Sequence, residues 1–336
     1  MRCLIELRNV WVRIAREQVL RGIDLCVEKG DYLVVLGPSG SGKTTLLRVI
    51  AGLIEPERGA ITINGKDATR VPPWERGVAL VQQIPGLLPH LSVLDNIVLA
   101  IMSRRRASRR EAFEEARRLL ELLRISDVAS KRPGELSGGQ LQRAAIAVAL
   151  AIRPEVLLLD EPLSHLDRPL AEQLRLELRR LHKELGVSVI HVTHDQDEAL
   201  SLATRLVILW SGEIVEEGAP EELYHRPRRT LTAKFLGLNV VDGAVFGKPG
   251  TRAVFSPEAV RISRQGGLEA IVEEIVRERG RVIVYAKLLG TNEPIRIYIH
   301  PREASSIKVG KIFLEVSTEG LHFLPTILAS SLTGSA

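Results

Sequence analysis

Residues 37–45 read Gly37-Pro38-Ser39-Gly40-Ser41-Gly42-Lys43-Thr44-Thr45 and match the pattern G-x-x-x-x-G-K-[ST] in full. Before this stretch, residues 32–36 form a short apolar, branched run that predicts a buried strand. After it, residues 45–53 predict a helix that packs on this strand. A strand, a glycine-rich loop and a helix are the context in which this pattern binds phosphate. The sequence therefore predicts a nucleoside triphosphate site organised around residues 37–45.

Each residue type in this loop has a separate chemical task. Glycines let the backbone curl so that successive N–H groups point at phosphate oxygens. The N-terminus of the following helix adds unpaired donors and the positive end of its dipole. Lys43 can then reach the β- and γ-phosphates, and the Thr44 hydroxyl can bind Mg²⁺.

Two further stretches place acids and a histidine at the ends of apolar runs. Residues 156–159 predict a buried parallel strand that leads into Asp160 and Glu161. Asp160 is a candidate for the Mg²⁺ shell, and Glu161 is a candidate for the base that polarises an attacking water. Residues 187–193 predict another buried strand. His194 at its end faces the same crevice as the phosphate loop, which makes it a candidate γ-phosphate sensor.

A second anion-binding helix end is predicted at Ser137-Gly138-Gly139-Gln140, just before an apolar helix at 144–152. It has no lysine of its own, so we expect it to complete a nucleotide site of another subunit. A plain helix cap is the alternative interpretation of Ser-Gly-Gly. The following Gln142 and Arg143 make the segment far more specific.

Length and composition describe a two-domain protein without a membrane-spanning helix. The 336 residues exceed one typical domain, and 45% hydrophobic with 26% charged residues is ordinary for a globular protein. No apolar run approaches the ~18 residues that span a bilayer, and the N-terminus lacks the apolar core of a signal peptide. Aromatic residues make up only 4%, which argues against an RNA-binding platform. We therefore expect the chain to stay in the cytoplasm.

Three side chains on predicted strands are expected to be structural. Cys3 and Cys26 are too few for a disulfide framework, so we expect two small buried thiols. His191 lies three residues before His194 on the same predicted strand, and we expect it to support that strand.

The remaining segments predict the surroundings of the site. Residues 3–9 and 18–27 alternate polar and apolar and predict a small antiparallel sheet. Residues 84–91 form an apolar loop broken by two prolines and a glycine, which favours contact with a partner. Residues 92–124 predict helices, with arginines at 104–106 and at 109 and 110. We interpret these arginines as a solvated helix face; contact with acidic lipid head groups is the alternative.

Six motifs in this order and spacing resemble those of an ATP-binding cassette (ABC) ATPase, through about residue 237. They are residues 37–45, Gln83, residues 136–140, residues 157–161, residues 164–167 and His194. Residues 89–93, 193–196 and 221–224 are similar to the importer branch that serves sugars, polyamines, oxyanions and iron. The resemblance implies an α/β fold, in which a P-loop NTPase core carries an antiparallel β-subdomain and a helical subdomain at about 86–153.

The resemblance also implies a head-to-tail homodimer with two ATP molecules at its interface. Each ATP would lie between the phosphate loop of one subunit and Ser137-Gly138-Gly139-Gln140 of the other. Asp167 would link the two sites across the dimer. The nucleotide-contacting set that follows is Ile14, Gly37, Pro38, Ser39, Gly40, Ser41, Gly42, Lys43, Thr44, Thr45, Gln83, Ser137, Gly138, Gly139, Gln140, Asp160, Asp167 and His194.

The family's catalytic roles carry over to positions that match its motifs. Glu161 is implied as the general base, with His194 and Lys43 on the γ-phosphate. Gln83 is implied to sense the metal and the attacking water and to signal to the membrane permease. The Mg²⁺ ligands implied by the resemblance are Thr44, Gln83 and Asp160.

The adenine platform departs from the family pattern. Relatives usually stack the base on an aromatic residue, and that place falls on Ile14 here. Either Ile14 offers an apolar platform, or Trp11 or Arg13 substitutes through a shifted loop. We favour Ile14, which predicts loose selectivity for the base.

The tail predicts a small all-β barrel, because short runs with strand character alternate with glycine turns from 240 to 317. Phe255-Ser256-Pro257-Glu258 resembles the Phe-Arg-Pro-Glu element of the TOBE-like (oligonucleotide-fold-like) regulatory domain of these importers, with Ser256 in place of arginine. We therefore assign residues 1–237 to an ABC nucleotide-binding domain and 238–336 to a barrel domain. This second domain is either a regulatory sensor or a dimer-stabilising appendage.

The resemblance implies the ATP-hydrolysing subunit of an importer at the cytoplasmic face of the membrane. Its expected partners are a second copy, integral membrane permease subunits at the apolar loop after Gln83 and, indirectly, an extracellular solute-binding protein. No nucleic acid is expected. The alternative is a soluble cassette protein acting on nucleic acid or ribosomes, but such proteins usually carry two cassettes, a long coiled-coil insertion or zinc cysteines.

Overall fold

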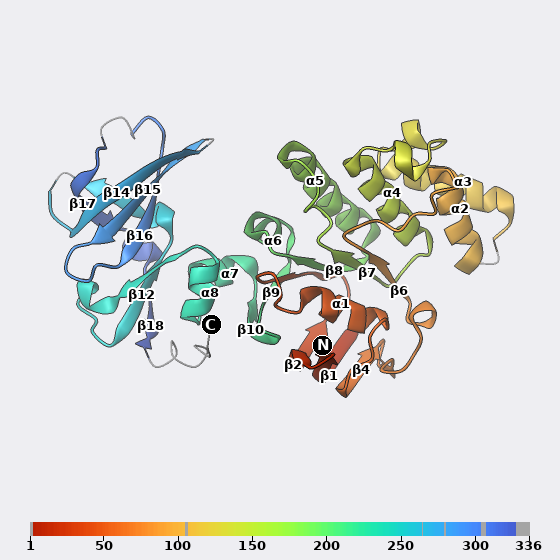
Figure 1. The fold of residues 1–336 in the computed structure, drawn as a ribbon, viewed down its shortest axis with the longest axis horizontal. Coiled ribbons are helices and arrows are strands. Elements are labelled where there is room, and N and C mark those ends of the chain that lie inside the picture. The colour runs from red at the N-terminus through yellow and green to blue at the C-terminus, as the bar shows by residue number, and fades with distance from the viewer. Residues whose placement is uncertain (1–2, 105–106, 264, 279, 304–306, 327–336) are drawn as a thin grey trace. The chain divides into compact units, whose positions relative to one another are not determined.

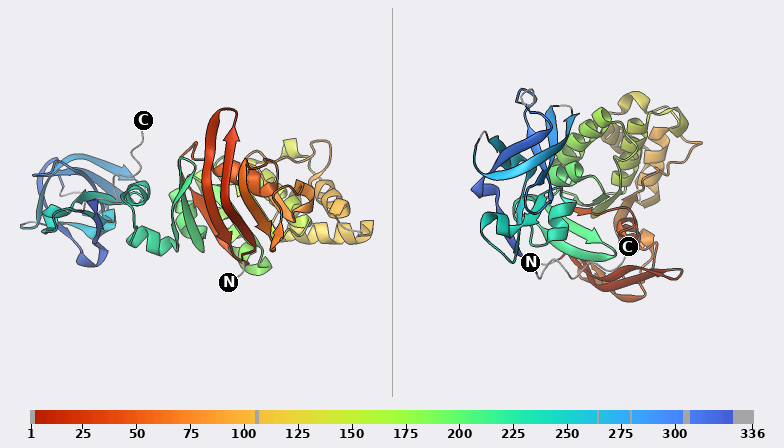
Figure 2. Two further views of the ribbon diagram at one scale, coloured as in Figure 1. Left: turned by 90° about the horizontal axis from the view of Figure 1, so that it is seen from below. Right: turned by 60° about the vertical axis from the view of Figure 1, so that its left-hand side comes forward.

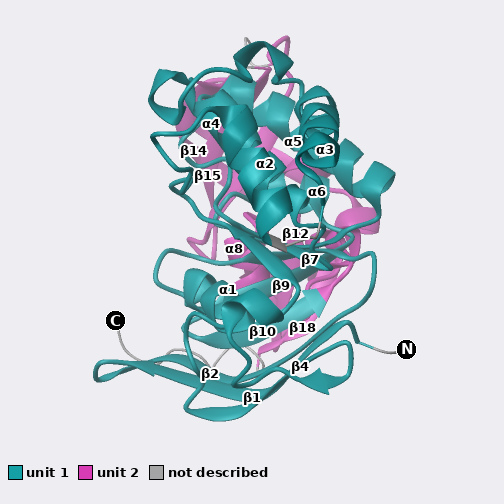
Figure 3. Ribbon diagram, turned by 90° about the vertical axis from the view of Figure 1, so that its right-hand side faces the viewer, with its two compact units in different colours: residues 1–217 teal, residues 218–336 magenta. Residues whose placement is uncertain are grey.

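The computed structural model describes residues 3–104, 107–263, 265–278, 280–303 and 307–326. These form two compact units, Met1–Glu217 and Gly218–Ala336 (Figure 3). The predicted domain boundary after residue 237 lies inside the second unit, beyond the short helices α7 (Pro220–His225) and α8 (Thr230–Phe235). No helix among the described residues is long and apolar enough to cross a membrane.

A six-stranded sheet forms the centre of the first unit (Figure 1). Its order is β10 (Glu213–Gly218), β9 (Arg205–Trp210), β3 (Tyr32–Leu36), β8 (Ser188–Thr193), β7 (Val156–Asp160) and β6 (Val78–Val81). The strands from β9 to β6 pair in parallel, and β3, β7 and β8 are buried at every position. Strands covered on both faces have continuous apolar sequences for this reason. The carboxyl ends of β3, β7 and β8 therefore meet at one edge.

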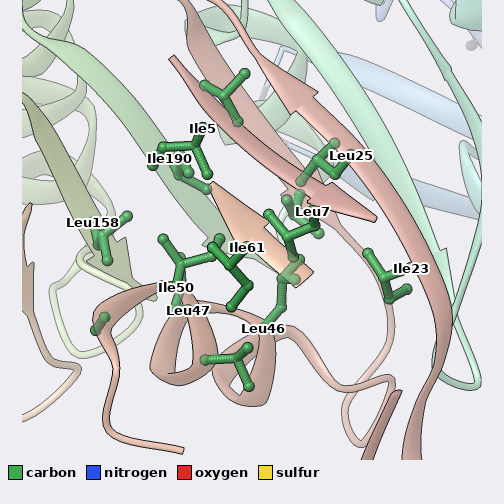
Figure 4. Packing of buried hydrophobic residues seen from close by; sticks show 14 of the residues in the cluster. Ile5, Leu7, Ile23, Leu25, Leu46, Leu47, Ile50, Ile61, Leu158 and Ile190 are labelled. Carbon is green, nitrogen blue, oxygen red and sulfur yellow. The ribbon is translucent and has the colours of Figure 1, made fainter. Parts of the chain in front are cut away.

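An antiparallel sheet near the N-terminus completes the core of the first unit (Figure 2, red to orange). Its order is β2 (Glu17–Val27), β1 (Ile5–Ile14), β4 (Arg58–Ile63) and β5 (Lys66–Asp67). Helix α1 (Lys43–Ala51) packs against both sheets: Leu46, Leu47 and Ile50 share one buried cluster with Ile5 and Ile61 of this sheet and with Leu158 and Ile190 of the central sheet (Figure 4). The helix that follows the phosphate loop is thus held by both sheets.

The prediction of two free buried thiols was wrong. Cys3 and Cys26 form a disulfide, and both residues are only half-buried. The antiparallel pairing of β1 with β2 sets Glu6 opposite Cys26 and brings the two cysteine Cα atoms to 5.4 Å, within the range that a disulfide spans. Cysteine number alone did not reveal this register.

Further helices of the first unit follow α1 along the chain. They are α2 (Val93–Arg104), α3 (Arg109–Leu122), α4 (Gly138–Ala151), α5 (Arg168–Leu185) and α6 (Gln196–Leu202). The first three pack on one another and form the predicted helical subdomain (Figure 1). Of the arginine cluster, Arg105 and Arg106 lie outside the described residues, whereas Arg110 forms an exposed i,i+4 pair with Glu114.

The second unit contains α7, α8 and two antiparallel sheets. The sheets begin at residue 239, after both helices, and agree with the strands predicted for the tail. One sheet has the order β11 (Asn239–Asp242), β12 (Thr251–Phe255) and β18 (His322–Pro325). The other has the order β13 (Val260–Ser263), β17 (Gly310–Val316), β14 (Leu268–Glu278), β15 (Arg281–Leu288) and β16 (Pro294–Ile299). Side chains from both sheets form one buried cluster around Phe255.

Candidate active site

The phosphate loop follows β3 and requires glycine at three positions. Gly40 and Gly42 have φ angles of +80° and +101°, which L side chains rarely adopt. A Cβ on Gly37 would lie 2.2 Å from the carbonyl oxygen of Leu209. Gly42 is the N-cap of α1, whose first residue is Lys43. The loop therefore curls onto a helix N-terminus, where unpaired N–H groups favour an anion.

The Lys43 ammonium lies inside this loop. Its Nζ donates to the carbonyl oxygens of Gly37 and Pro38, both at 2.9 Å, and lies 3.9 Å from Glu161 Oε1. The residue is 5% exposed. Burial lowers the pKa of Lys43, while the charges of Glu161 and Asp160 oppose this shift. The cation is thus placed where phosphate oxygens would meet both it and the loop amides.

Thr44 and Asp160, two of the three predicted metal ligands, are in direct contact. Thr44 Oγ1 donates to Asp160 Oδ1 at 2.9 Å. Burial raises the pKa of Asp160, against the lowering effect of the Thr44 hydrogen bond, and the charge of Glu161 raises it further. A hydroxyl and a carboxylate are oxygen ligands that suit Mg²⁺. Two oxygen ligands fit an ion that takes its other ligands from phosphate and water.

Glu161 is held in an unusual backbone conformation at the end of β7. Its φ is +45°, and its N–H donates to the carbonyl oxygen of Val192 on β8 at 3.0 Å. His194 Nδ1 lies 3.1 Å from Glu161 Oε2. The carboxylate therefore stands between His194, which is exposed, and the buried Lys43. The structure brings together the predicted base, the predicted γ-phosphate sensor and the loop lysine.

Gln83 connects to this group through Ser164, which is not among the predicted site residues. Gln83 Nε2 donates to Ser164 Oγ at 3.3 Å, and Ser164 Oγ donates to the Glu161 carbonyl oxygen at 2.9 Å. Ser164 thus bridges the loop after β6 and the backbone of the predicted base. Its place three residues after Glu161, within the 164–167 motif, was the available signal.

Ser137, Gln140 and Asp167 lie at the starts of α4 and α5, as caps. Ser137 Oγ accepts from Gln140 N at 3.4 Å, and Gln140 Oε1 accepts from Ser137 N at 3.1 Å. Asp167 Oδ1 accepts from Leu170 N at 3.0 Å. Their hydrogen bonds stabilise two helix ends, while Gly138 and Gly139 form the first turn of α4. We refer to residues 137–140 and Asp167 as the cap group. Its hydrogen bonds are separate from the contacts around Lys43 and Glu161.

Comparison with known proteins assigns the chain to a family. The ABC transporter family pattern matches residues 20–164. The molybdate/tungstate import ATP-binding protein WtpC of Thermococcus kodakarensis is 41% identical over 285 residues, which cover 84% of this chain and 82% of that protein. The chain belongs to the ABC transporter family. The Fe(3+) ions import ATP-binding protein FbpC of Rhizobium etli is 42% identical over 251 residues, or 74% of this chain and 71% of that protein.

Solved ABC structures share the fold of this ABC ATPase. The dimeric ATP-binding cassette MJ0796, in a post-hydrolysis state with ADP and Pi, has a TM-score of 0.58 and 32% identity. The match covers 64% of this chain and 98% of that one. CbiO1 of Clostridium perfringens, part of the ABC transporter complex cbiONQ, has a TM-score of 0.62 and 25% identity over 66% of this chain and 91% of that one. These similarities confirm the predicted P-loop NTPase core and its ATPase class.

The end of the β1–β2 hairpin carries the candidate base platform of this ABC ATPase. A Cβ on Gly42 would lie 2.8 Å from Leu20 Cδ2, so β2 passes beside the phosphate loop. Ile14, at the end of β1, is 44% exposed. The Trp11 indole instead donates to Asn9 Oδ1 at 2.7 Å and packs beside Gly22, and Arg13 Nε lies 3.5 Å from Glu57. These contacts favour Ile14 over Trp11 and Arg13.

An apolar groove of about 540 Å³ lies beside Gln83, between the central sheet and the helical subdomain of this ABC ATPase. Leu80 and Gln82 line it together with Leu87 of the apolar loop and Val148 of α4. Ile84 in the same loop is 76% exposed. An exposed apolar surface next to a site residue is the feature that the sequence predicted for permease contact.

Proposed function

We propose that this chain is the ATP-hydrolysing subunit of an ABC importer and energises uptake of a small solute. The observation that carries the proposal is the contact group of Lys43, Glu161 and His194 beside the Thr44–Asp160 pair. It combines a phosphate cradle, a metal pair and a carboxylate base in one place. The relatives named above are import ATP-binding proteins for molybdate or tungstate and for iron, which supports an oxyanion or iron as the solute. A sugar or a polyamine stays in the proposed solute class because the motifs at 89–93, 193–196 and 221–224 resemble the branch that also serves these solutes.

The proposed chemistry is attack of water on the γ-phosphorus of ATP. Residues 37–45 bind the β- and γ-phosphates, with Lys43 exchanging the Gly37 and Pro38 carbonyl oxygens for phosphate oxygens. Glu161 accepts the water proton as the new P–O bond forms and the bond to the ADP oxygen breaks. His194 and Gln83 orient the γ-phosphate and the water. Thr44, Asp160 and Gln83 would hold Mg²⁺, which would neutralise charge on the phosphates.

The proposed assembly is a head-to-tail homodimer beside a membrane permease. Residues 137–140 of one subunit would cover the ATP held by the loop of the other, because their helix end offers N–H groups to an anion. ATP would close the dimer and hydrolysis would open it. The groove beside Gln83 would receive the permease at the cytoplasmic face of the membrane, and the solute-binding protein would act only through the permease.

Co-purification from native membranes tests the importer assignment. The full chain is isolated under mild detergent conditions, and the bound proteins are identified by mass spectrometry, with MgATP hydrolysis measured on the same preparation. We expect an integral membrane permease and phosphate release that requires Mg²⁺. Recovery of ribosomes or nucleic acid without a membrane protein would contradict the importer proposal and favour a soluble ATP-driven switch.

A further inference from the structure

The starts of α4 and α5 lie against each other in one subunit. A Cβ on Gly138 would lie 3.4 Å from Leu166 Cδ2, and one on Gly139 would lie 3.7 Å from Leu170. Gly138 and Gly139 belong to the segment that offers its N–H groups to the partner's nucleotide. Leu166 directly precedes Asp167, the N-cap of α5. The start of α4 at Gly138 and Gly139 and the residues around Asp167 are therefore close to van der Waals contact.

A charged pair joins the same two helices further along. Arg143 Nε of α4 lies 2.9 Å from Glu177 Oε2 of α5, and Arg143 Nη2 donates to Glu177 Oε1 at 3.2 Å. Both side chains are only 11% exposed. Gln173 Nε2 donates to Glu177 Oε1 at 3.3 Å and orients the carboxylate from within α5. The proposed hydrolysis step does not use any of these three residues.

Because the Arg143–Glu177 pair is largely buried, it holds α4 and α5 together. A guanidinium and a carboxylate that lose most of their water depend on each other, because either charge left alone would be poorly solvated. Arg143 lies six residues after Ser137, which is about 9 Å along the helix axis. The pair is thus close enough to the N-terminus of α4 to fix the orientation of residues 137–140.

We infer that Arg143 and Glu177 are positioning residues that hold residues 137–140 and Asp167 as one unit facing the partner's nucleotide. The inference rests on the proposed head-to-tail dimer. It predicts that loss of the pair weakens closure of the dimer. ATP binding to a single subunit would be unaffected, because it depends on residues 37–45 and Asp160. The Ser164 hydrogen bond to the Glu161 backbone lies at the start of the same 164–167 segment. This connects the base of one site to the cap group that serves the other.

The test uses full-length chain with Glu161→Gln as a background that retains ATP. Sedimentation velocity over a concentration series gives the dimer dissociation constant with MgATP, for Glu161→Gln alone and with Arg143→Gln or Glu177→Gln added. A fluorescent ATP analogue, at protein concentrations below dimerisation, gives the affinity of the single subunit. We expect the added variants to weaken the dimer about tenfold and to leave the affinity of the single subunit unchanged.

Two further variants separate positioning from loss of folding. Reversal of both charges, Arg143→Glu with Glu177→Arg, is expected to restore much of the dimer affinity that either single reversal removes. Arg110→Gln removes an exposed i,i+4 pair with Glu114 on α3 and is the matched control, with no expected effect. Thermal unfolding of each variant shows that the chain is folded.

The outcomes distinguish the positioning role of Arg143 and Glu177 from the head-to-tail dimer on which it rests. If Glu161→Gln alone forms no MgATP-dependent dimer, the head-to-tail sandwich itself is wrong. If it dimerises and Arg143→Gln dimerises equally well, the positioning inference is wrong and the sandwich stands. Equal losses in single-subunit affinity and in dimerisation, or no recovery in the double reversal, would also overturn the inference.

Discussion

At the scale of single residues, Glu161 shows how the fold aims a reactive group. A φ of +45° is unfavourable for a residue with a Cβ and costs on the order of 1–3 kcal/mol. The hydrogen bond from its N–H to Val192 and the burial of β7 hold it there. The turn points the carboxylate away from the strand, toward Lys43 and His194. Strain at this position is consistent with a role in which direction matters more than stability.

The Glu161→Gln variant tests that role. Glutamine keeps the size of the side chain but cannot accept a proton, so we expect turnover to fall about 10²–10⁴-fold with ATP affinity retained. Steady-state phosphate release and equilibrium binding of ATP measure the two effects. Glu172→Gln, which removes one partner of an exposed pair on α5, is the control. Near-normal turnover in Glu161→Gln would remove Glu161 from the role of base.

The Ile14 platform makes a second prediction at this scale. Because an aliphatic side chain contacts any purine face without hydrogen bonds, we expect ATP and GTP affinities to differ by less than about tenfold. Ile14→Tyr should tighten binding of both about threefold to tenfold through stacking. Trp11→Phe is the control, since the indole is engaged with Asn9. A hundredfold preference for ATP in the unaltered chain would contradict the aliphatic platform.

At the scale of elements, the sequence predicts best where one pattern serves both fold and chemistry. The strand–loop–helix unit at β3 and α1 was predictable because glycines, lysine and the apolar runs occur within one local stretch. The start of α4 at Gly138 was placed six residues too late, since glycine is a poor helix former and the capping pair of Ser137 and Gln140 outweighs that preference. The strand β18 and the disulfide depend on pairing between distant segments, which no local pattern contains.

The first turn of α6 carries a buried acid, Glu198, with a defined pH dependence. His191 Nε2 lies 3.2 Å from Glu198 Oε2, and Tyr32 Oη lies 3.2 Å from His191 Nδ1, which supports the structural role predicted for His191. Burial alone would raise the pKa of Glu198, but the hydrogen bonds and charge of His191, with Thr193, hold it below its ordinary value of 4.5. The folded state therefore favours the ionised carboxylate.

Glu198→Gln should accordingly destabilise the chain in a pH-dependent way. A lowered pKa in the folded state adds stability above the ordinary value of 4.5 that is lost as the pH falls through the folded pKa. We expect the variant to lose about 2 kcal/mol at pH 7, and the difference from the unaltered chain to shrink below pH 4.5. Thermal midpoints of both chains at pH 7 and below pH 4.5 measure this difference in stability. An equal difference at all pH values would contradict the predicted linkage.

The disulfide between β1 and β2 makes the next prediction. It closes a loop with a sequence separation of 23 residues. Because the link restricts the unfolded chain, it raises the free energy of unfolding by about 3 kcal/mol. We expect reduction, or replacement of Cys3 and Cys26 by serine, to lower the thermal midpoint while MgATP hydrolysis at moderate temperature is retained. Mass spectrometry of the unreduced chain detects the link. Two alkylated thiols in protein isolated without reductant would contradict it.

At the scale of the whole molecule, the chemistry resides in one unit. The contacts among Lys43, Asp160, Glu161, Gln83 and His194 all lie within Met1–Glu217. The second unit has its own apolar cluster of strands. Helix α8 packs on β11 and β12 of that unit, and its Thr232 and Ala233 are fully buried. We therefore expect the second unit to modulate the ATPase and not to supply its catalytic groups.

Two truncated chains test this division and the position of the boundary. A chain that ends after Gly218 retains β10 and every catalytic contact, so we expect it to be folded and to hydrolyse MgATP within about threefold of the full chain. A chain that ends after Gly237 retains α8 but lacks β11 and β12, so its buried apolar side chains become exposed and should promote aggregation. Size-exclusion chromatography and steady-state hydrolysis compare the two. If the longer chain is the stable one, α7 and α8 belong to the nucleotide-binding domain, as the predicted boundary at 237 requires.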